Sequence, residues 1–108
     1  MSMPLETPTA VRRMVDATNA ADSAAFLDSF TDDGVVDDWG REFVGRDAIA
    51  GWNNRENIGA HSHFTDHQVT GNGSTYAATV TVKGDGYNGA GTFTFQLDGD
   101  RIARFTIR

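Results

Sequence analysis

The chain has 108 residues, with 9 basic and 15 acidic side chains, and its formal net charge is −6. This length predicts a single domain spanning residues 1–108. The acidic balance disfavours nucleic acid and anionic membrane surfaces as partners. Because the chain has no Cys, it cannot form disulfides or use a thiolate.

The N-terminus is polar and lacks the basic start and apolar stretch of a signal peptide. Residues 1–6 are predicted to be a flexible tail. No apolar run in the sequence is long enough to cross a bilayer. We therefore expect a cytoplasmic protein that makes no membrane contact.

The first predicted helix begins at Thr7 and Pro8, which suit the N-cap and the first helical position. Apolar residues then recur with the helical spacing of i, i+3, i+4 and i+7. They are Val11, Met14, Val15 and Thr18. This pattern predicts one buried helix face.

Two more helices are expected before the chain changes character. Asp22 can cap a short second helix, which should end at the turn cluster 32–34. Its apolar side would hold Phe26, Leu27 and Phe30. The third helix should run from Asp47 to Gly59, with Ile49 and Trp52 on its apolar side.

The remaining segments read as β-strands. A short strand pair, 35–39 and 41–45, is expected about a tight turn at Gly40. Four longer strands follow, separated by Gly-Asn-Gly, Gly-Asp-Gly and Asp-Gly-Asp, which are typical of hairpin turns. They are 61–70, 75–83, 89–97 and 101–108. The middle strands alternate apolar residues with uncharged Thr, so one face is suited to a dimer contact. The order of elements predicts an α+β fold with helices on one face of an antiparallel sheet.

Two segments of the N-terminal half resemble a known superfamily. They are the run from Asn19 to Asp38 and the segment Gly45–Ile49, GRDAI. Both are similar to the nuclear-transport-factor-2-like superfamily, especially its SnoaL-like and ketosteroid-isomerase-like branches. The resemblance implies a curved antiparallel sheet wrapped around three N-terminal helices as a cystatin-like cone with an internal apolar pocket. It also implies a homodimer formed through the outer sheet face.

The same resemblance implies a catalytic carboxylate. Ketosteroid isomerases shuttle a proton with a carboxylate near the end of the first strand, and Asp38 stands at the matching place. The Tyr and protonated Asp that hold the enolate oxygen in those enzymes correspond to Met14 and Phe93, so these oxyanion residues are not matched. An enzyme of this kind would need no cofactor and would act as an isomerase, dehydratase or cyclase.

Asp38 is followed by Trp39, and this pair is the sharpest local signal. A carboxylate against an indole inside an apolar cone is desolvated, which raises its pKa and makes it a better general base near neutral pH. Asp37 should point the opposite way, into solvent, because side chains alternate along a strand. The alternative interpretation is that both are strand-end residues of the Gly40 turn.

The histidines are the other candidate catalytic residues. His61 and His63 share one face of the predicted strand 61–70, and either could be an acid–base partner of Asp38. His67 would share that face unless a bulge intervenes. Asp66 lies on the opposite face, so no metal site is expected. The alternative is that all three are exposed histidines without a role.

Together these observations predict a protein that binds a small, largely apolar organic molecule. The expected pocket residues are Met14, Phe26, Phe30, Trp39, Trp52 and Phe93. Such pockets are mostly apolar with a few placed polar groups. Asp38 would be the base if the protein is an enzyme. The alternative is a noncatalytic ligand-binding or dimerisation module.

Overall fold

A computed structural model describes residues 7–108, and the predicted tail at 1–6 lies outside the described residues. Within residues 7–108, three helices, one short 3₁₀ turn (η1) and six strands follow an order that matches the expected α+β class. They are α1 (Thr9–Asn19), α2 (Ser23–Asp28), β1 (Phe30–Asp38), β2 (Arg41–Val44), α3 (Arg46–Glu56), η1 (Ile58–Ala60), β3 (His63–Asn72), β4 (Thr75–Lys83), β5 (Gly89–Asp98) and β6 (Arg101–Ile107). No helix within residues 7–108 is long and apolar enough to span a membrane.

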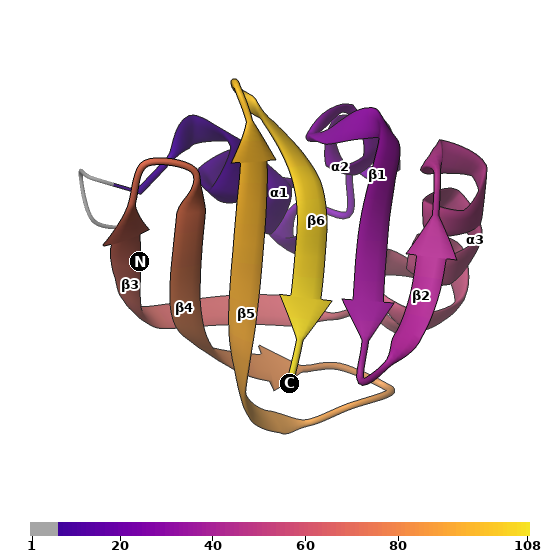
Figure 1. The fold of residues 1–108 in the computed structure, drawn as a ribbon. Coiled ribbons are helices and arrows are strands. Elements are labelled where there is room, and N and C mark those ends of the chain that lie inside the picture. The colour runs from indigo at the N-terminus through magenta and orange to yellow at the C-terminus, as the bar shows by residue number, and fades with distance from the viewer. Residues whose placement is uncertain (1–6) are drawn as a thin grey trace.

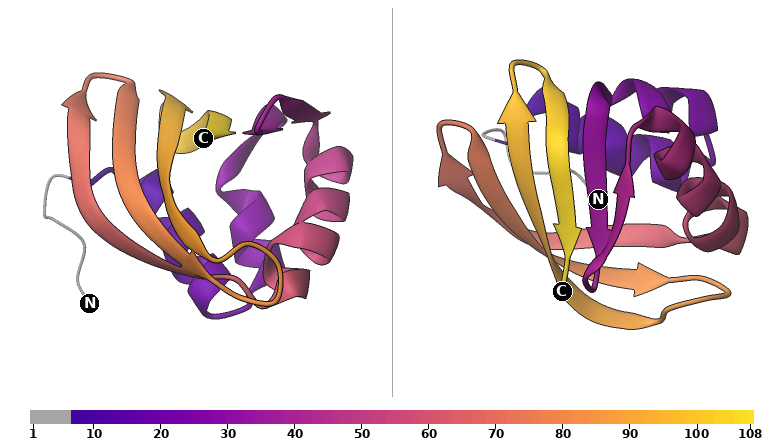
Figure 2. Two further views of the ribbon diagram at one scale, coloured as in Figure 1. Left: turned by 90° about the horizontal axis from the view of Figure 1, so that it is seen from below. Right: turned by 45° about the vertical axis from the view of Figure 1, so that its right-hand side comes forward.

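The six strands form one sheet in the order β2-β1-β6-β5-β4-β3, with the helices behind it in Figure 1. Seen from below, the sheet bends around the helices, as the predicted cone requires (left panel of Figure 2). The sheet is mixed rather than antiparallel throughout, because β1 and β6 pair in parallel. The strand β6 lies between β1 and β5. Turn motifs in the sequence cannot predict its pairing with β1, because the two strands are far apart in the chain.

Helix α1 buries the predicted face, with Val11, Met14, Val15 and Thr18 all buried. Its start differs from the prediction. The helix begins at Thr9, Pro8 occupies the N-cap position, and no side chain caps it. Thr7 is instead buried beside the core. The register of the first turn is thus set by packing rather than by a capping hydroxyl.

Phe30 belongs to β1 rather than to the second helix. Helix α2 ends at Asp28, and the Ser29 hydroxyl donates a hydrogen bond to the carbonyl of Ala25. Phe30 then pairs with Ile102 of β6, and the register shifts before Val35. The predicted turn at 32–34 is therefore an irregular stretch inside a longer strand.

Aromatic rings fill the space between the helices and the inner face of the sheet. The rings of Phe95 and Phe105 stack with centroids 5.1 Å apart, and Phe93 meets Phe105 edge-on at 4.9 Å. From the helical side, Phe26 packs against Phe30 at 5.3 Å. Full burial of one such side chain contributes about 1.5–3 kcal/mol, so these rings dominate the core.

A buried polar network joins the three helices. The side-chain amide of Asn57 donates to the hydroxyl of Thr18 on α1 and to Asn53 on α3, at 3.2 and 3.0 Å. Asn53 in turn donates to the Ser23 hydroxyl on α2, at 3.2 Å. Asn53 and Asn57 are almost completely buried. Hydrogen bonds to other helices thus compensate these two buried amides for the hydrogen bonds to water that they lose on folding.

Candidate functional site

A cavity of about 300 Å³ opens between α3, the β1–β2 turn and the inner face of the sheet. This volume is at the lower end of the range for small-molecule sites. Its apolar wall comes from five residues, Trp52, Phe64, Val82, Phe93 and Ile107. The other lining residues are Asp38, Trp39, Arg41, Arg55, Glu56, Asn57, Ala60, Ser62, Gly86 and Tyr87. The site is an apolar chamber with a polar, partly aromatic opening.

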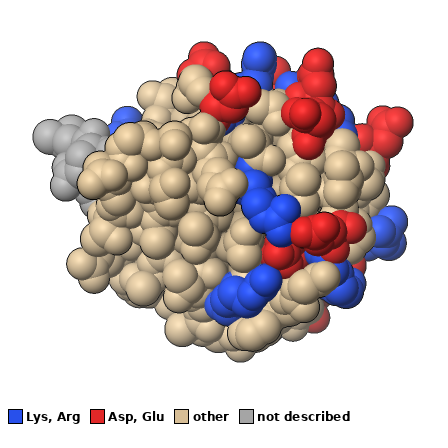
Figure 3. Space-filling model, in the orientation of Figure 1, with Lys and Arg blue, Asp and Glu red and all other residues tan. Residues whose placement is uncertain are grey.

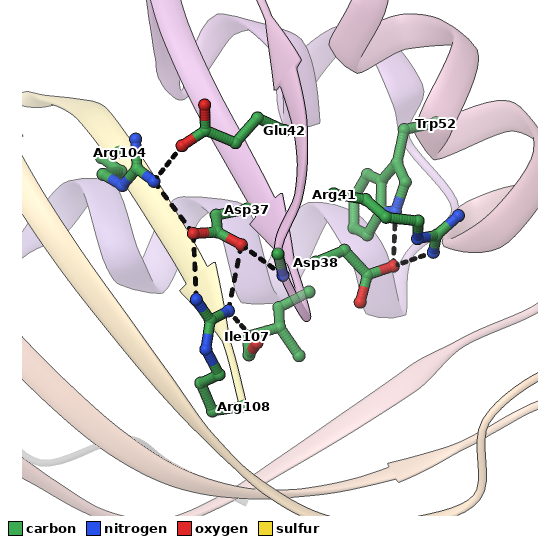
Figure 4. A network of polar contacts seen from close by, with 9 residues as sticks. Asp37, Asp38, Arg41, Glu42, Trp52, Arg104, Ile107 and Arg108 are labelled. Carbon is green, nitrogen blue, oxygen red and sulfur yellow. Dashed lines mark hydrogen bonds and ion pairs between the residues drawn. The ribbon is translucent and has the colours of Figure 1, made fainter.

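Asp38 lies in the wall of this cavity, at the end of β1. Its Oδ2 atom accepts a hydrogen bond from Trp52 Nε1 at 3.1 Å and pairs with Arg41 Nη2 at 2.6 Å (Figure 4). The side chain is only 15% exposed. No residue in the described part of the chain donates a hydrogen bond to Oδ1. One carboxylate oxygen is held in place, and the other is available to a ligand.

The β1–β2 hairpin explains why Asp38 and Arg41 meet. The two residues are direct partners across the ladder, joined by the two-residue turn Trp39–Gly40. Opposed residues of an antiparallel pair project to the same face, so both side chains point toward α3. Trp52 is on the buried side of α3 and reaches Asp38 from there.

Arg41 is itself fixed by a second carboxylate. It donates two hydrogen bonds to Glu56 of α3, at 2.7 and 3.0 Å, in the fork geometry typical of Arg–carboxylate pairs. The hydrogen bonds to Glu56 raise the pKa of Arg41 and lower that of Glu56. Asp38, Arg41 and Glu56 thus form a charged rim on one side of the opening.

Asp37 points away from the cavity, to the outer face of the sheet, as strand alternation predicts (Figure 4). It is not solvated, however, because it is only 5% exposed. Arg108 donates a hydrogen bond to each carboxylate oxygen of Asp37, at 3.0 and 3.1 Å. Arg104 donates a third hydrogen bond at 2.9 Å, and the Gly40 amide donates a fourth at 2.8 Å. Arg104 also pairs with Glu42. The expectation that Asp37 faces solvent is therefore wrong, because Arg104 of β6 and Arg108, directly after that strand, cover it.

The predicted pocket residues divide into two groups. Trp52 and Phe93 line the cavity, and Trp39 lines it from the opening, where its side chain is 63% exposed. Three others are fully buried in the core and do not line it, because α1 and α2 pack tightly against the sheet there. They are Met14, Phe26 and Phe30.

The structure does not bring the histidines to Asp38. His61 follows η1 in a left-handed conformation and pairs with Asp85 on the surface, at 2.6 Å. His63 is exposed at the start of β3, and neither residue lines the cavity. A bulge does occur at His67, whose Nε2 contacts the Thr81 hydroxyl at 2.6 Å. Within residues 7–108, no three His, Asp or Glu side chains group as a metal site requires.

Arg41 and Glu56 were not among the site residues predicted from the sequence, although both line the cavity and contact each other. A signal for Arg41 was present, because a two-residue hairpin turn makes the residues on either side of it direct neighbours. No comparable signal existed for Glu56, whose contact with Arg41 depends on how α3 docks against the hairpin.

Residues 11–105 match the family model of the SnoaL-like domain, and the chain therefore belongs to this family of the nuclear-transport-factor-2-like superfamily. No curated protein is significantly similar to the chain. The predicted superfamily and fold are thus confirmed.

Solved structures repeat the same fold. A Sinorhizobium meliloti protein provisionally assigned as a polyketide cyclase is 27% identical, with a TM-score of 0.89 over 99% of this chain and 100% of that one. A Mycobacterium tuberculosis protein in complex with estradiol-17β-hemisuccinate is 16% identical, with a TM-score of 0.81 over 91% of this chain and 88% of its own. A computationally designed 17-OHP binder is also 16% identical, with a TM-score of 0.83 over 92% and 86% of the two chains.

Proposed function

We propose that the protein binds a small, largely apolar organic molecule in the cavity, with Asp38 as the polar contact. The observation that carries this proposal is an apolar chamber of about 300 Å³ with the half-buried Asp38 carboxylate in its wall. Oδ1 of Asp38 would accept a hydrogen bond from a ligand hydroxyl. Neighbours of the same fold that hold an estradiol derivative or 17-OHP support the choice of ligand class.

Obstructing the cavity tests this proposal. Val82 lies on the apolar wall, so the indole of Val82→Trp should project into the chamber and take up part of its volume. With 2-naphthol as the probe, we expect calorimetry to show micromolar to millimolar binding by the natural protein and about tenfold weaker binding by the variant. Val44→Trp is the matched control, because Val44 is exposed and lies outside the cavity. Equal affinity in all three proteins would place the probe elsewhere and contradict the proposal.

Proton transfer at carbon is the second candidate function, with Asp38 as the base. The free Oδ1 of Asp38 supports it, since that atom could remove a proton from a bound ketone while Arg41 and Trp52 keep the carboxylate in position. The reaction class would be isomerisation, dehydration or cyclisation. A noncatalytic binding module is the alternative, favoured by the lack of a hydrogen-bond donor pair like that of the ketosteroid isomerases.

Exchange of a carbon-bound hydrogen of a ketone for deuterium separates catalysis from simple binding. We expect the natural protein to speed deuterium incorporation beside the carbonyl of 2-tetralone in D₂O, followed by proton NMR. Asp38→Asn keeps the shape of the side chain but removes the base, so the acceleration should fall by about 10²–10⁴-fold. If the natural protein and Asp38→Asn give the same exchange rate as buffer, the protein is a binding module for this class of ligand.

We also propose a homodimer that forms through the outer face of β3, β4 and β5. Charged side chains gather over β6, β1 and β2, whereas the side of the face over β3 and β4 is almost without them (Figure 3). Its outward residues are small and uncharged, as rows across the sheet show: Gln68, Thr79 and Thr92 in one row, and Thr70, Ala77 and Thr94 in the next.

A further inference from the structure

Two exposed aromatic side chains stand at the opening of the cavity. The described part of the chain has three large apolar side chains that are mostly exposed, and two of them, Trp39 and Tyr87, line this cavity. They come from different segments, Trp39 from the β1–β2 turn and Tyr87 from the loop between β4 and β5. The third, Val44, lies elsewhere. Exposed apolar surface at a cavity opening is typical of a binding site.

Trp39 occupies a backbone conformation that does not suit it. Its φ is +53° and that of Gly40 is +90°, so both central residues of the turn are left-handed. Two-residue hairpin turns of this kind favour Asn-Gly, and a bulky side chain with positive φ is an outlier. The backbone amide of Trp39 donates to the Ile107 carbonyl at 3.2 Å, which fixes the turn against β6.

No side-chain hydrogen bond or ring contact in the described part of the chain offsets the strain at Trp39. The indole of Trp39 makes no hydrogen bond and no ring contact with residues 7–108. A mostly exposed residue that strains the backbone without a side-chain hydrogen bond or ring contact to offset the strain is a candidate for a functional role.

Tyr87 is also held in place, although it is 55% exposed. Its hydroxyl donates to the carbonyl of Ala90 at 2.8 Å. Gly89, with a φ of +154°, leaves room for the ring, since a Cβ there would lie 2.9 Å from the Tyr87 hydroxyl oxygen. The Asn88 side chain bonds to both the amide and the carbonyl of Gly84, which closes the loop on itself. The ring is therefore presented at the opening by a loop built to hold it.

We infer that Trp39 and Tyr87 form an aromatic clamp that holds the outer part of a ligand with a planar ring system. This inference rests on the proposed binding function and narrows its ligand class to planar, aromatic or conjugated molecules. The apolar end of the ligand enters the chamber, and its ring plane at the opening packs against the two aromatic side chains. Rings prefer such offset or edge-on contacts with other rings, and a saturated, puckered skeleton cannot make them equally well.

A matched pair of probes isolates the clamp. 2-Naphthol and decahydro-2-naphthol share a skeleton and a hydroxyl, but only the first is planar. We expect the natural protein to bind 2-naphthol about three- to tenfold more tightly than the saturated compound. Trp39→Asn and Tyr87→Leu should each reduce that preference toward unity, whereas Val44→Asn, at an exposed site outside the cavity, should retain it.

Thermal unfolding without any probe is the second measurement. Because Asn is favoured at the first position of this turn, Trp39→Asn should unfold at a Tm equal to or above that of the natural protein. A lower Tm would show that Trp39 stabilises the fold, which would contradict its assignment to the clamp.

The binding outcomes distinguish the two proposals. If the natural protein binds both probes equally, or if Trp39→Asn keeps the preference for 2-naphthol, the clamp is wrong and the cavity proposal stands. If the natural protein binds neither probe, the cavity proposal fails and the clamp fails with it.

Discussion

Asp37 and Asp38 are neighbours in the chain, yet their carboxylates meet opposite surroundings on the two faces of β1. Asp38 faces the cavity with one oxygen held by Arg41 and Trp52. Asp37 faces outward, where Arg108, Arg104 and a backbone amide satisfy both of its oxygens. The first arrangement leaves an atom for a ligand, and the second leaves none. Adjacent identical residues thus divide into one that lines the cavity and one whose oxygens are both bonded to the protein.

The ion pairs of Asp37 predict a specific pH dependence of stability. Hydrogen bonds from Arg108 lower the pKa of Asp37 from 3.8 to about 2, with further contributions from Gly40 and Arg104. A carboxyl whose folded-state pKa is depressed stabilises the fold above its unfolded value and loses that effect as pH falls through the folded value. The stabilisation by Asp37 should therefore be complete above about pH 4 and fade toward pH 2.

Asp37→Asn tests this dependence. We expect the variant to be less stable than the natural protein at pH 7, and the difference in Tm to shrink between pH 4 and pH 2. Asp16→Asn is the matched control, because Asp16 is exposed on α1 and forms no ion pair within residues 7–108. A stability difference that stays constant down to pH 2 would show that the ion pairs of Asp37 do not carry its effect.

The site was partly predictable at this scale. Asp38 could be found from the resemblance and from its place at a strand end, and alternation correctly separated it from Asp37. The burial of Asp37 could not be predicted, because its partners Arg104 and Arg108 are 67 and 71 residues away in the sequence, and the pairing of β6 with β1 was unknown. His61 was misplaced because the left-handed turn after η1 directs it outward, toward Asp85.

Among the elements, α3 is unusual because polar residues lie on its buried side. It buries Asn53, and Asn57 directly after it, where an amphipathic helix normally buries apolar residues. Their amides link α3 to α1 and α2, so the relative positions of the three helices depend on directional bonds as well as on packing. Trp52, which holds Asp38, is on the same helix, and its position depends on that arrangement.

Removal of the Asn57 amide should therefore destabilise the protein. Asn57→Ala removes the donor to the Thr18 hydroxyl and leaves Asn53 Oδ1 only its longer bond from the Ile58 amide, at 3.4 Å, which costs about 1–3 kcal/mol. Urea unfolding followed by circular dichroism measures the loss. Asn54→Ala, an exposed change on the same helix, should stay within about 0.5 kcal/mol of the natural protein. Equal effects of the two changes would contradict a special role for the network.

The elements themselves were largely predictable, because each has a local signature. The spacing of Val11, Met14 and Val15 predicted α1, and the glycine turns predicted the hairpins of β3 to β6. Phe30 was assigned to a helix because a buried aromatic residue just after a helix has the same sequence pattern as one on it. The parallel pairing of β1 with β6 has no local signature, since it joins segments from opposite ends of the chain.

At the scale of the whole molecule, charge is unevenly distributed over the outer face of the sheet. The ion pairs of Asp37 and Glu42 with the two C-terminal arginines occupy one side, and the Thr-rich rows of β3, β4 and β5 occupy the other (Figure 3). A surface that lacks charge can be desolvated at low cost, which is what an interface between two copies requires.

A charge placed on that surface should separate the two copies. We expect sedimentation at micromolar concentration to show a dimer of the natural protein and a monomer of Thr79→Arg, because a buried, unpaired guanidinium is strongly unfavourable in an interface. Asn54→Arg, which adds the same charge on α3, should remain dimeric. A natural protein that sediments as a monomer would rule out the dimer.

The position of β6 inside the sheet affects how the chain can be made. One edge of β1 pairs with β2 soon after synthesis, but its other edge must wait for β6, about 70 residues later. At 5–20 residues per second, this interval lasts roughly 4–14 s on a ribosome. Throughout this interval, β1 presents an unpaired edge, and Phe30 and Val36 lack their neighbours Ile102 and Phe105 on β6. The nascent chain should therefore be most vulnerable to aggregation and proteolysis before its last strand emerges, and closure around β6 should limit the rate at which the protein matures.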